Sequence, residues 1–330
     1  MKHIFIINPC AGLVDKTEYV RAELKKRSDI EAIVFNTEEA GHETALMREM
    51  VEIFDDEDVR IYICGGSGTF SKALDALDVE ELDHVEVAFF PCGLTNDFIK
   101  NFGYGALQFD DFNALIKGKC MHADYMRCVI DGDDKNVRNN VLFVTVGIMA
   151  NIERVSRFIK FVGGISPAFM YGIGTALSLP FTPAVDYEVI IDGKDYSREY
   201  KLIYIGNGFC CGGGFIPIKY DVDCKDGILN VLLLKRIPPL NFIKYFKEFM
   251  NGELPDKRQN DAEVIRCKEI YVRRKDSKAM CINADGEIYN DISWHVKVVN
   301  NRLKLVVPDG VKFATSHEEV MEYLYRRDKR

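Results

Sequence analysis

Hydrophobic positions in the first hundred residues alternate between two spacings. Runs of β-branched and aromatic residues predict four strands, at 3–7, 30–35, 59–63 and 85–90. Between them, apolar residues at helical spacing, with Glu, Lys and Arg on the opposite side, predict helices at about 15–27, 41–54 and 69–77. Strands that alternate with helices form a parallel sheet covered on both faces. We therefore predict a doubly wound α/β domain over residues 1–123.

The pattern changes near Asp124, where short runs of alternating polar and apolar residues begin. These runs lie at 125–130, 137–146, 187–191, 200–205, 228–234, 269–272, 279–282, 294–299 and 303–307. Turn signals separate them: Asp131-Gly132, Asp192-Gly193, Asp226-Gly227 and Asn300-Asn301. Such spacing predicts an antiparallel β-sandwich over residues 124–307. After Asp124, only residues 239–250 and 316–326 have the pattern of helices. We expect residues 308–330, which include the second of these helices, to return to the first domain.

Composition and charge exclude several classes of protein. The chain has 330 residues, 47% hydrophobic and 28% charged, as in soluble globular proteins, and its net charge of −8 argues against general nucleic-acid binding. No basic, then apolar, leader opens the sequence, so we expect no secretory signal and a cytoplasmic protein. The ten cysteines show no C-x-x-C pair, and several lie in apolar runs, which predicts buried free thiols and neither disulfides nor a zinc site. We found neither H-E-x-x-H nor G-x-S-x-G.

Residues 161–185 carry no charge and are numerous enough to cross a bilayer. The segment also contains four glycines and three prolines, and its hydrophobicity is moderate. We therefore favour short buried helices or a pocket wall, and predict no transmembrane segment.

The segment 59–70, VRIYICGGSGTF, passes from a strand through a glycine turn into a helix. This arrangement presents backbone N–H groups to a phosphate, and glycine permits close approach. Many buried strands also end in glycine turns, so this segment alone fits both interpretations.

Three other polar loops follow the remaining strands of the first domain. Because ligands of doubly wound sheets bind at the carboxyl ends of the strands, four loops at one edge favour a phosphate or nucleotide site over ordinary turns. The candidate nucleotide-binding residues are Asn8, Pro9, Gly12, Thr37, Gly65, Gly66, Ser67, Gly68, Thr69, Gly93, Thr95 and Asn96.

Two acidic clusters stand out in the second domain. Asp285 and Glu287 are two residues apart, so on an extended backbone they face the same side, and paired carboxylates suit a general base. The alternative is an Asp-Gly hairpin turn with solvated acids. Asp223 and Asp226, beside Gly227, either chelate a hard cation or form a turn.

The order of these motifs resembles the diacylglycerol kinase catalytic-domain family of lipid kinases, over nearly the whole chain. The matching segments are NPCAG at 8–12, Thr37 with Gly41-His42, GGSGT at 65–69, PCGLTNDF at 91–98, Asp124, Gly212–Gly214 with Pro217 and Asp226-Gly227, and Asp285-Gly286-Glu287. The resemblance implies an ATP-dependent kinase that phosphorylates the hydroxyl of diacylglycerol or a similar lipid.

The resemblance also implies roles for individual residues. Asp285 matches the general base, and Glu287 matches its partner near an active-site Mg²⁺. Asp97 and Asp124 match further members of that acidic network. Asp223, Asp226 and the carbonyl of Ile228 match a second, structural Mg²⁺ site.

Three positions depart from the family pattern. Ser67 replaces the Asp of G-G-D-G-T, Leu94 replaces a phosphate-side Thr, and Ala11 replaces a Ser. A hydroxyl cannot supply the charge of the missing carboxylate. The sequence therefore leaves two accounts open: a divergent active kinase, which we favour, and a catalytically weak relative that binds nucleotide or lipid.

A lipid substrate implies peripheral contact with a membrane. Apolar residues of 161–185 are candidates for an acyl-chain channel, although ordinary core is the alternative. Short basic runs at 273–278 and 326–330 are candidates for headgroup contact, or are simply solvated. Strand edges of the second domain leave a homodimer open.

Overall fold

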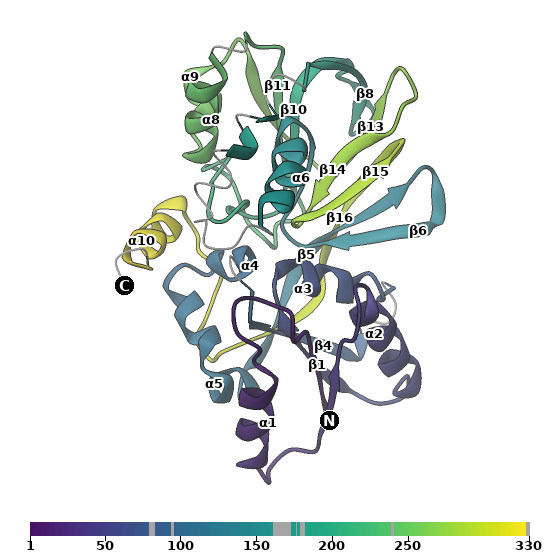
Figure 1. Ribbon diagram of the computed structural model, residues 1–330, viewed down its shortest axis with the longest axis vertical. Helices are drawn as coiled ribbons and strands as arrows, with labels where there is room; N and C mark the ends of the chain where they lie inside the picture. Colours follow the sequence, from purple (N-terminus) through teal and green to yellow (C-terminus); the bar gives the residue numbers. More distant parts are fainter. Residues whose placement is uncertain are drawn as a thin grey trace. The chain divides into compact units, whose positions relative to one another are not determined.

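The computed structural model describes residues 1–78, 83–93, 96–160, 173–175, 177–178, 182–238 and 241–327 (Figure 1). The chain divides into two compact units. The first contains Met1–Tyr125, Asp223–Asp226 and Val299–Arg330, and the second contains Met126–Val222 and Gly227–Val298. The α/β and β-sandwich architectures predicted from the sequence are both present, one in each unit.

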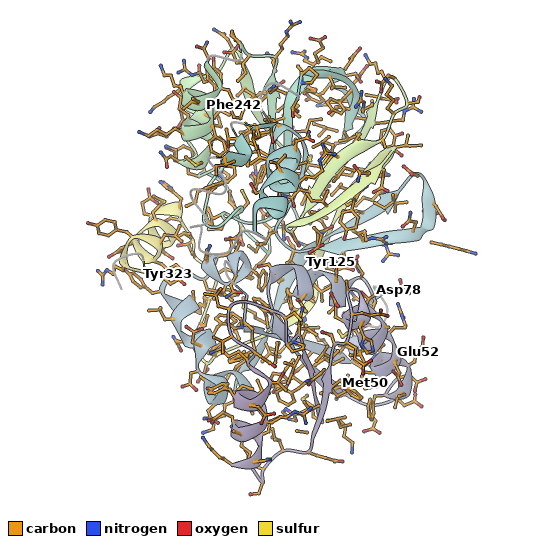
Figure 2. All side chains as sticks on the ribbon, in the orientation of Figure 1. Met50, Glu52, Asp78, Tyr125, Phe242 and Tyr323 are labelled. Atoms are coloured by element: carbon orange, nitrogen blue, oxygen red, sulfur yellow. The ribbon has the colours of Figure 1, made fainter. Side chains whose placement is uncertain are left out.

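A parallel sheet forms the centre of the first unit. Its strands are β1 (Lys2–Ile7), β2 (Ala32–Asn36), β3 (Val59–Gly65) and β4 (Val85–Pro91), in the order β4-β3-β1-β2. The connecting helices are α1 (Thr17–Lys25), α2 (His42–Ile53) and α3 (Ser67–Leu74). Each helix has one apolar face; on α2, Met50 is buried and Glu52 is exposed (Figure 2). This alternation confirms the predicted doubly wound fold.

The C-terminal helix completes the first unit. Short helices follow β4, namely α4 (Asp97–Lys100), η2 (Gly103–Asp110) and α5 (Phe112–Ile116), and the chain ends in α10 (His317–Arg327). The N–H of Ala314 donates to the carbonyl of Asn101 at 2.7 Å, and Tyr323 of α10 is buried (Figure 2). The Arg326 guanidinium lies 5.1 Å from the Tyr104 ring centroid. The tail therefore returns to the first domain, as predicted.

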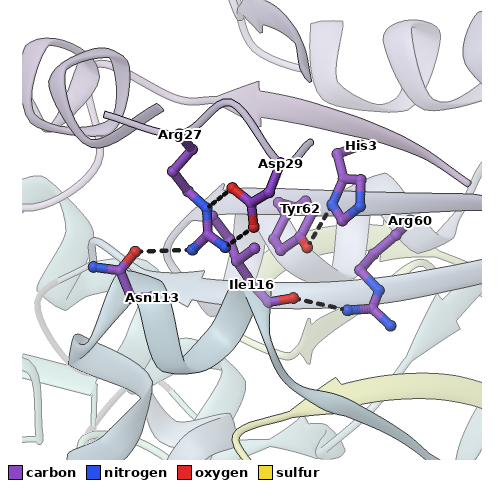
Figure 3. A network of polar contacts seen from close by, with 7 residues as sticks. All are labelled: His3, Arg27, Asp29, Arg60, Tyr62, Asn113 and Ile116. Atoms are coloured by element: carbon purple, nitrogen blue, oxygen red, sulfur yellow. Dashed lines mark hydrogen bonds and ion pairs between the residues drawn. The ribbon is translucent and has the colours of Figure 1, made fainter. Parts of the chain in front are cut away.

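A polar network closes the amino-terminal edge of this sheet (Figure 3). The Tyr62 hydroxyl lies 2.9 Å from His3 Nδ1, and burial raises the pKa of Tyr62 to about 12. Arg60 Nη1 donates to the carbonyl of Ile116 at 3.0 Å, which ties β3 to α5. These contacts anchor the edge opposite to the glycine-rich loops.

Antiparallel strands form the second unit. They are β6 (Asp133–Asn140), β7 (Phe143–Gly147), β8 (Val185–Ile191), β9 (Lys194–Asp195), β10 (Arg198–Gly206), β11 (Leu229–Lys235), β12 (Ala262–Cys267), β13 (Glu269–Arg274), β14 (Met280–Ala284) and β15 (Glu287–Asp291). Two long strands, β5 (Lys119–Ile130) and β16 (Ser293–Val307), each contribute residues to both units. The core between the strands includes Val189, Ile203, Leu233 and Trp294.

Several boundaries differ from the sequence prediction. The expected strand 137–146 is two strands, because the chain turns at Val141 and Leu142. The expected strands 294–299 and 303–307 are one strand, since Asn301 takes a positive φ of 51° without ending β16. The sequence also missed α6 (Ile148–Lys160), β12 and β15. Besides α6, this unit has α8 (Phe242–Met250) and α9 (Leu254–Lys257).

Two further sequence expectations bear on chemistry. All ten cysteines are free thiols, as predicted, but Cys10 and Cys120 are exposed, whereas we expected buried thiols. Within the described ranges, we find no helix with the length and apolar character needed to cross a bilayer. Most of the uncharged segment 161–185, with its proposed acyl-chain channel, lies outside the described residues.

Candidate functional site

Three polar loops of the first unit meet at the carboxyl edge of the parallel sheet. Asn8, which follows β1, donates from Nδ2 to Thr69 Oγ1 of α3 at 3.0 Å. The Asn8 N–H also donates to the carbonyl of Cys64 at 2.9 Å. The loop after β1 is therefore bound directly to the glycine turn after β3.

Glycines allow these loops to approach closely. A Cβ on Gly12, whose φ is +77°, would lie 2.1 Å from the carbonyl oxygen of Cys92. A Cβ on Gly93 would lie 2.6 Å from the Cα of Gly66. Side chains at Gly12 and Gly93 are incompatible with this packing, so the glycines bring three loop backbones together.

The turn after β3 leads into the N-terminus of α3. Ser67 is the first helical residue, and the first N–H groups of a helix have no partner within it. The Ser67 hydroxyl is buried and has no hydrogen-bond partner among the described residues. Gly66 has an ordinary φ of −91°, and a Cβ there would only touch the Cα of Gly93, at 3.5 Å. These N–H groups and the helix dipole favour a bound anion.

The loop after β4 is held by its own side chain. The N–H of Gly93 donates to Asn96 Oδ1 at 3.0 Å, and Asn96 Nδ2 donates back to the carbonyl of Gly93 at 2.8 Å. Asn96 takes a left-handed conformation with φ of 43°. Thr95, a nucleotide-binding candidate, and Leu94, which replaces a phosphate-side Thr, lie outside the described residues.

Thr37 and Pro9 complete the carboxyl edge. The Thr37 N–H donates to the carbonyl of Ile7 at 2.8 Å, which places the loop after β2 beside the loop after β1. Pro9 lies in a turn closed by the Cys10 N–H and Asn8 Oδ1 at 3.0 Å. The structure thus brings the described nucleotide-binding candidates of all four loops to one edge of the sheet.

Asp97 forms a buried ion pair with Lys100. The two residues lie on α4, three positions apart, with 5% and 1% of their surfaces exposed. The ammonium group compensates the carboxylate charge, as a buried ion requires. The sequence analysis missed Lys100, although the i, i+3 spacing was visible.

Asp124 forms hydrogen bonds with two other segments of the first unit. Its Oδ1 accepts from the N–H of Asn301 at 2.6 Å and from Asn300 Nδ2 at 3.1 Å. Its own N–H donates to the carbonyl of Cys224 at 2.7 Å. Asp124 therefore joins the 223–226 loop to Asn300 and Asn301 of β16.

The two acids of the 223–226 loop differ in their environment. Asp223 is partly exposed, and its Oδ1 accepts from the N–H of Lys225 at 3.1 Å. Asp226 is exposed and precedes Gly227, whose φ is +71°. The local geometry is that of a turn.

Asp285 lies in a two-residue hairpin turn between β14 and β15. Asp285 and Gly286 have φ of 48° and 91°, and the flanking residues Ala284 and Glu287 pair across the strands. The expectation of an extended backbone from Asp285 to Glu287 is wrong, because the chain reverses between them. Glu287 is half-buried at the start of β15.

The turn does not expose Asp285 to solvent. Only 3% of its surface is accessible, and its carboxylate accepts three backbone N–H groups. Val141 donates to Oδ2 at 2.7 Å; Leu142 and Phe143 donate to Oδ1 at 3.0 and 2.8 Å. Sequence reasoning missed these donors, because they come from a segment more than 140 residues earlier.

Two of the candidate acids already have partners in the structure. In the parts of the chain that the structure describes, no three His, Cys, Asp or Glu side chains are grouped to hold a metal ion. Asp97 is bound to Lys100, and Asp285 to three N–H groups. These two carboxylates are thus engaged by groups of the chain itself, and we derive no chemical step through a metal ion.

Family models match nearly all of the chain. The diacylglycerol kinase catalytic domain matches residues 2–128. The YegS C-terminal NAD kinase beta sandwich-like domain matches residues 142–307. The two models follow one another along the chain, as the α/β and β-rich units do.

Relatives and solved structures show the same likeness. A "putative lipid kinase" of Staphylococcus carnosus (strain TM300) is 25% identical over 250 residues, covering 75% of this chain and 76% of the relative. A second protein named "putative lipid kinase", from Staphylococcus aureus (strain MSSA476), is 26% identical over 250 residues, covering 74% of this chain and 76% of the relative. A crystal structure of a diacylglycerol kinase from Bacillus anthracis str. Sterne has a TM-score of 0.64 at 19% identity, covering 94% of this chain and 98% of that one. The last likeness concerns the fold.

Proposed function

Since the chain belongs to the diacylglycerol kinase catalytic-domain family of lipid kinases, we propose that it transfers the γ-phosphoryl group of ATP to a lipid hydroxyl. The proposed acceptor is diacylglycerol or a lipid with a similar free hydroxyl. The observation that carries the proposal is the packing of glycine loops at the carboxyl edge of the parallel sheet. Family membership supplies the reaction class.

In this proposal the first unit binds the phosphates of ATP. The N-terminus of α3 offers unpaired N–H groups, and Gly66 leaves the approach open. The hydrogen bond between Asn8 and Thr69 and the Gly12–Cys92 contact hold the neighbouring loops in place. Phosphoryl transfer depends mainly on such positioning, because it needs little covalent chemistry from the protein.

Asp285 is the proposed general base. It would accept the proton of the lipid hydroxyl as that oxygen attacks the γ-phosphorus, with Glu287 beside it on the hairpin. Three N–H donors fix the carboxylate in one orientation. A carboxylate oxygen has more than one lone pair, so these bonds leave it able to accept a further proton.

Magnesium enters the proposal as part of the substrate, bound to the phosphates of ATP. The metal roles that the resemblance implies for Asp97, Asp124 and Glu287 stay predictions. The second site, at Asp223, Asp226 and the carbonyl of Ile228, also stays a prediction. Oxygen donors of this kind suit Mg²⁺.

A lipid acceptor places the protein at a membrane surface. We propose peripheral contact from the cytoplasm and a role in phospholipid metabolism. A homodimer through strand edges stays a prediction.

One observation favours a second candidate, a nucleotide- or lipid-binding relative with little turnover. Ser67 stands where the family has Asp, and its buried hydroxyl has no hydrogen-bond partner in the described part of the chain. If this account holds, Ser67→Asp will raise ATP turnover strongly, whereas the native protein will bind ligand and transfer no phosphate.

A phosphate-transfer assay tests the proposal. Labelled γ-phosphate from MgATP is offered to a panel of detergent-dispersed lipids with native protein and with Asp285→Asn, and rates are normalised to the folded fraction measured by circular dichroism. We expect a labelled product that partitions into chloroform with native protein and is lost in the variant. Label only in the aqueous phase would indicate a kinase for a soluble alcohol. No transfer, with binding retained, would favour the second candidate.

A further inference from the structure

A cavity in the second unit lies away from the residues discussed so far. It measures about 260 Å³ and opens between α6 and the strands β8, β13, β14 and β15. Figure 1 shows α6 beside β14 and β15, against which it packs. Cys281 and Met280 line it at the start of β14, whereas Asp285 follows the other end of that strand. Four residue steps along the chain separate Cys281 from Asp285, roughly 13 Å at the rise of a β-strand.

The lining of the cavity is basic. Arg154 of α6 and Arg274 of β13 both line it, and the described lining residues include no Asp or Glu. Arg274 is paired with Asp276 through two hydrogen bonds, from Nε to Oδ1 at 2.9 Å and from Nη2 to Oδ2 at 2.6 Å. Arg154 has no carboxylate partner in the described part of the chain. The cavity therefore carries an excess of positive charge that a bound anion would compensate.

Two successive hydrogen bonds hold the Arg154 guanidinium in the lining of the cavity. Its Nη2 donates to Asn151 Oδ1 at 2.6 Å, and Asn151 Nδ2 donates to the carbonyl of Gly147 at 3.2 Å. Both Asn151 and Gly147 also line the cavity. The remaining N–H groups of Arg154 make no hydrogen bond to any described residue. A guanidinium oriented in this way offers forked donors to a phosphate or carboxylate.

A third cationic side chain, that of Lys201, contacts a residue that lines the cavity. Lys201 of β10 is 5% exposed, and its Nζ donates to the carbonyl of Thr182, a lining residue. Burial lowers the pKa of Lys201. Within the described ranges no carboxylate is paired with it, so an anion in the cavity would also compensate this buried charge.

We propose that this cavity binds a phosphate group, with Arg154 and Arg274 as its charged ligands. Arg154 can bind phosphate in forked geometry, Arg274 contributes its charge and its Nη1 donors, and Asn290 in the lining adds an amide. The phosphate belongs either to a soluble phosphomonoester or to the headgroup of an anionic phospholipid. The inference does not depend on the proposed kinase activity, because it rests on a different cavity.

Equilibrium binding of two probes tests the proposal. Isothermal titration calorimetry measures inorganic phosphate and glycerol 3-phosphate, and co-sedimentation measures vesicles of phosphatidylcholine with and without phosphatidate. We expect Arg154→Gln and Arg274→Gln each to weaken binding by about tenfold or more, since each removes a charged hydrogen-bonding ligand. Arg154→Lys keeps the charge but loses the two parallel N–H donors of the guanidinium, so its affinity should lie between those of native protein and Arg154→Gln.

Arg273→Gln is the matched control, because Arg273 precedes Arg274 on β13 and is paired with Glu188 instead. A variant effect confined to the soluble probes would identify a free phosphomonoester, and one confined to phosphatidate vesicles would identify the headgroup. Either supports the site. Equal losses in Arg273→Gln, unchanged affinity in both cavity variants, or no binding of any probe would overturn it. Melting temperatures confirm that each variant is folded.

An independent readout is the thiol of Cys281, which lines the cavity. Phosphate should slow its alkylation in native protein and leave the rate in Arg154→Gln unchanged. Equal protection in both proteins would contradict the assignment.

Discussion

Gly12 and Cys92 meet so closely that a Cβ on Gly12 would lie 2.1 Å from the carbonyl oxygen of Cys92. The contact joins the loop after β1 to the loop after β4. It explains why residue 12 must be glycine, both for space and for its φ of +77°. The candidate nucleotide site depends on this packing.

Gly12→Ala should therefore separate the two loops. We expect a loss of about 1–3 kcal/mol in the free energy of unfolding, from backbone strain and the clash, together with weaker ATP binding. The control is Gly132→Ala, where φ is +72° but nothing lies within 4 Å of the added Cβ. Denaturant unfolding and ATP titration measure both quantities. Native ATP affinity in Gly12→Ala would contradict the role assigned to the contact.

Asp285→Asn should destabilise the second unit as well as stop phosphate transfer. The amide keeps one acceptor oxygen, and its NH₂ group would face a backbone N–H from the 141–143 segment. Leaving a buried N–H unsatisfied costs about 1–3 kcal/mol. Thermal unfolding measures the loss, with the half-buried Glu287→Gln as comparison. A melting temperature equal to that of native protein would mean that these hydrogen bonds do not stabilise the turn.

The stability of the first unit should fall in mild acid because of His3. Burial, followed by the charge of Arg60, lowers the pKa of His3 from 6.5. The unfolded chain then binds the proton more readily, so stability is complete above pH 6.5 and is lost as the pH falls from there to the lower folded pKa. We expect His3→Gln to reduce the drop in melting temperature between pH 7.5 and pH 5.5. An identical drop in the variant would refute this assignment.

Asp226→Ala tests the second magnesium site. If Asp223, Asp226 and the Ile228 carbonyl bind Mg²⁺, then Mg²⁺ at about a hundred times its dissociation constant stabilises native protein by about 2.7 kcal/mol. We expect the variant to melt lower than native protein in Mg²⁺ and to match it more closely in chelator. Equal differences in both conditions would show that residues 223–228 form only a turn.

The local patterns of the sequence predicted the fold well where each element depends on its own residues. The four parallel strands and the hairpin turns at Asp131-Gly132 and Asp192-Gly193 were predicted, because β-branched runs and Asp-Gly pairs act locally. The meeting of the polar loops at one edge followed from the parallel topology alone. Helix α6 was missed, because it follows β7 directly without a turn signal.

Features that depend on distant partners escaped the sequence analysis. The run from Val137 to Val146 was predicted as one strand although it contains Asn139-Asn140, and it breaks just after this pair, where three N–H groups turn toward Asp285. Asn300-Asn301 resembles a turn, but β16 continues through it, and both residues donate hydrogen bonds to Asp124. The burial of Asp285 was missed for the same reason, since its hydrogen-bond donors lie far from it in the sequence.

The central claim is that the glycine turn after β3 binds the phosphates of ATP, and ATP titration of Gly66→Ala and Gly66→Val tests it most directly. Gly66 has an ordinary φ of −91°, and an added Cβ would lie 3.5 Å from the Cα of Gly93, so alanine fits the fold. We predict melting temperatures close to that of native protein for Gly66→Ala, with ATP affinity reduced in it and abolished in Gly66→Val. Unchanged ATP affinity in both folded variants would contradict the claim.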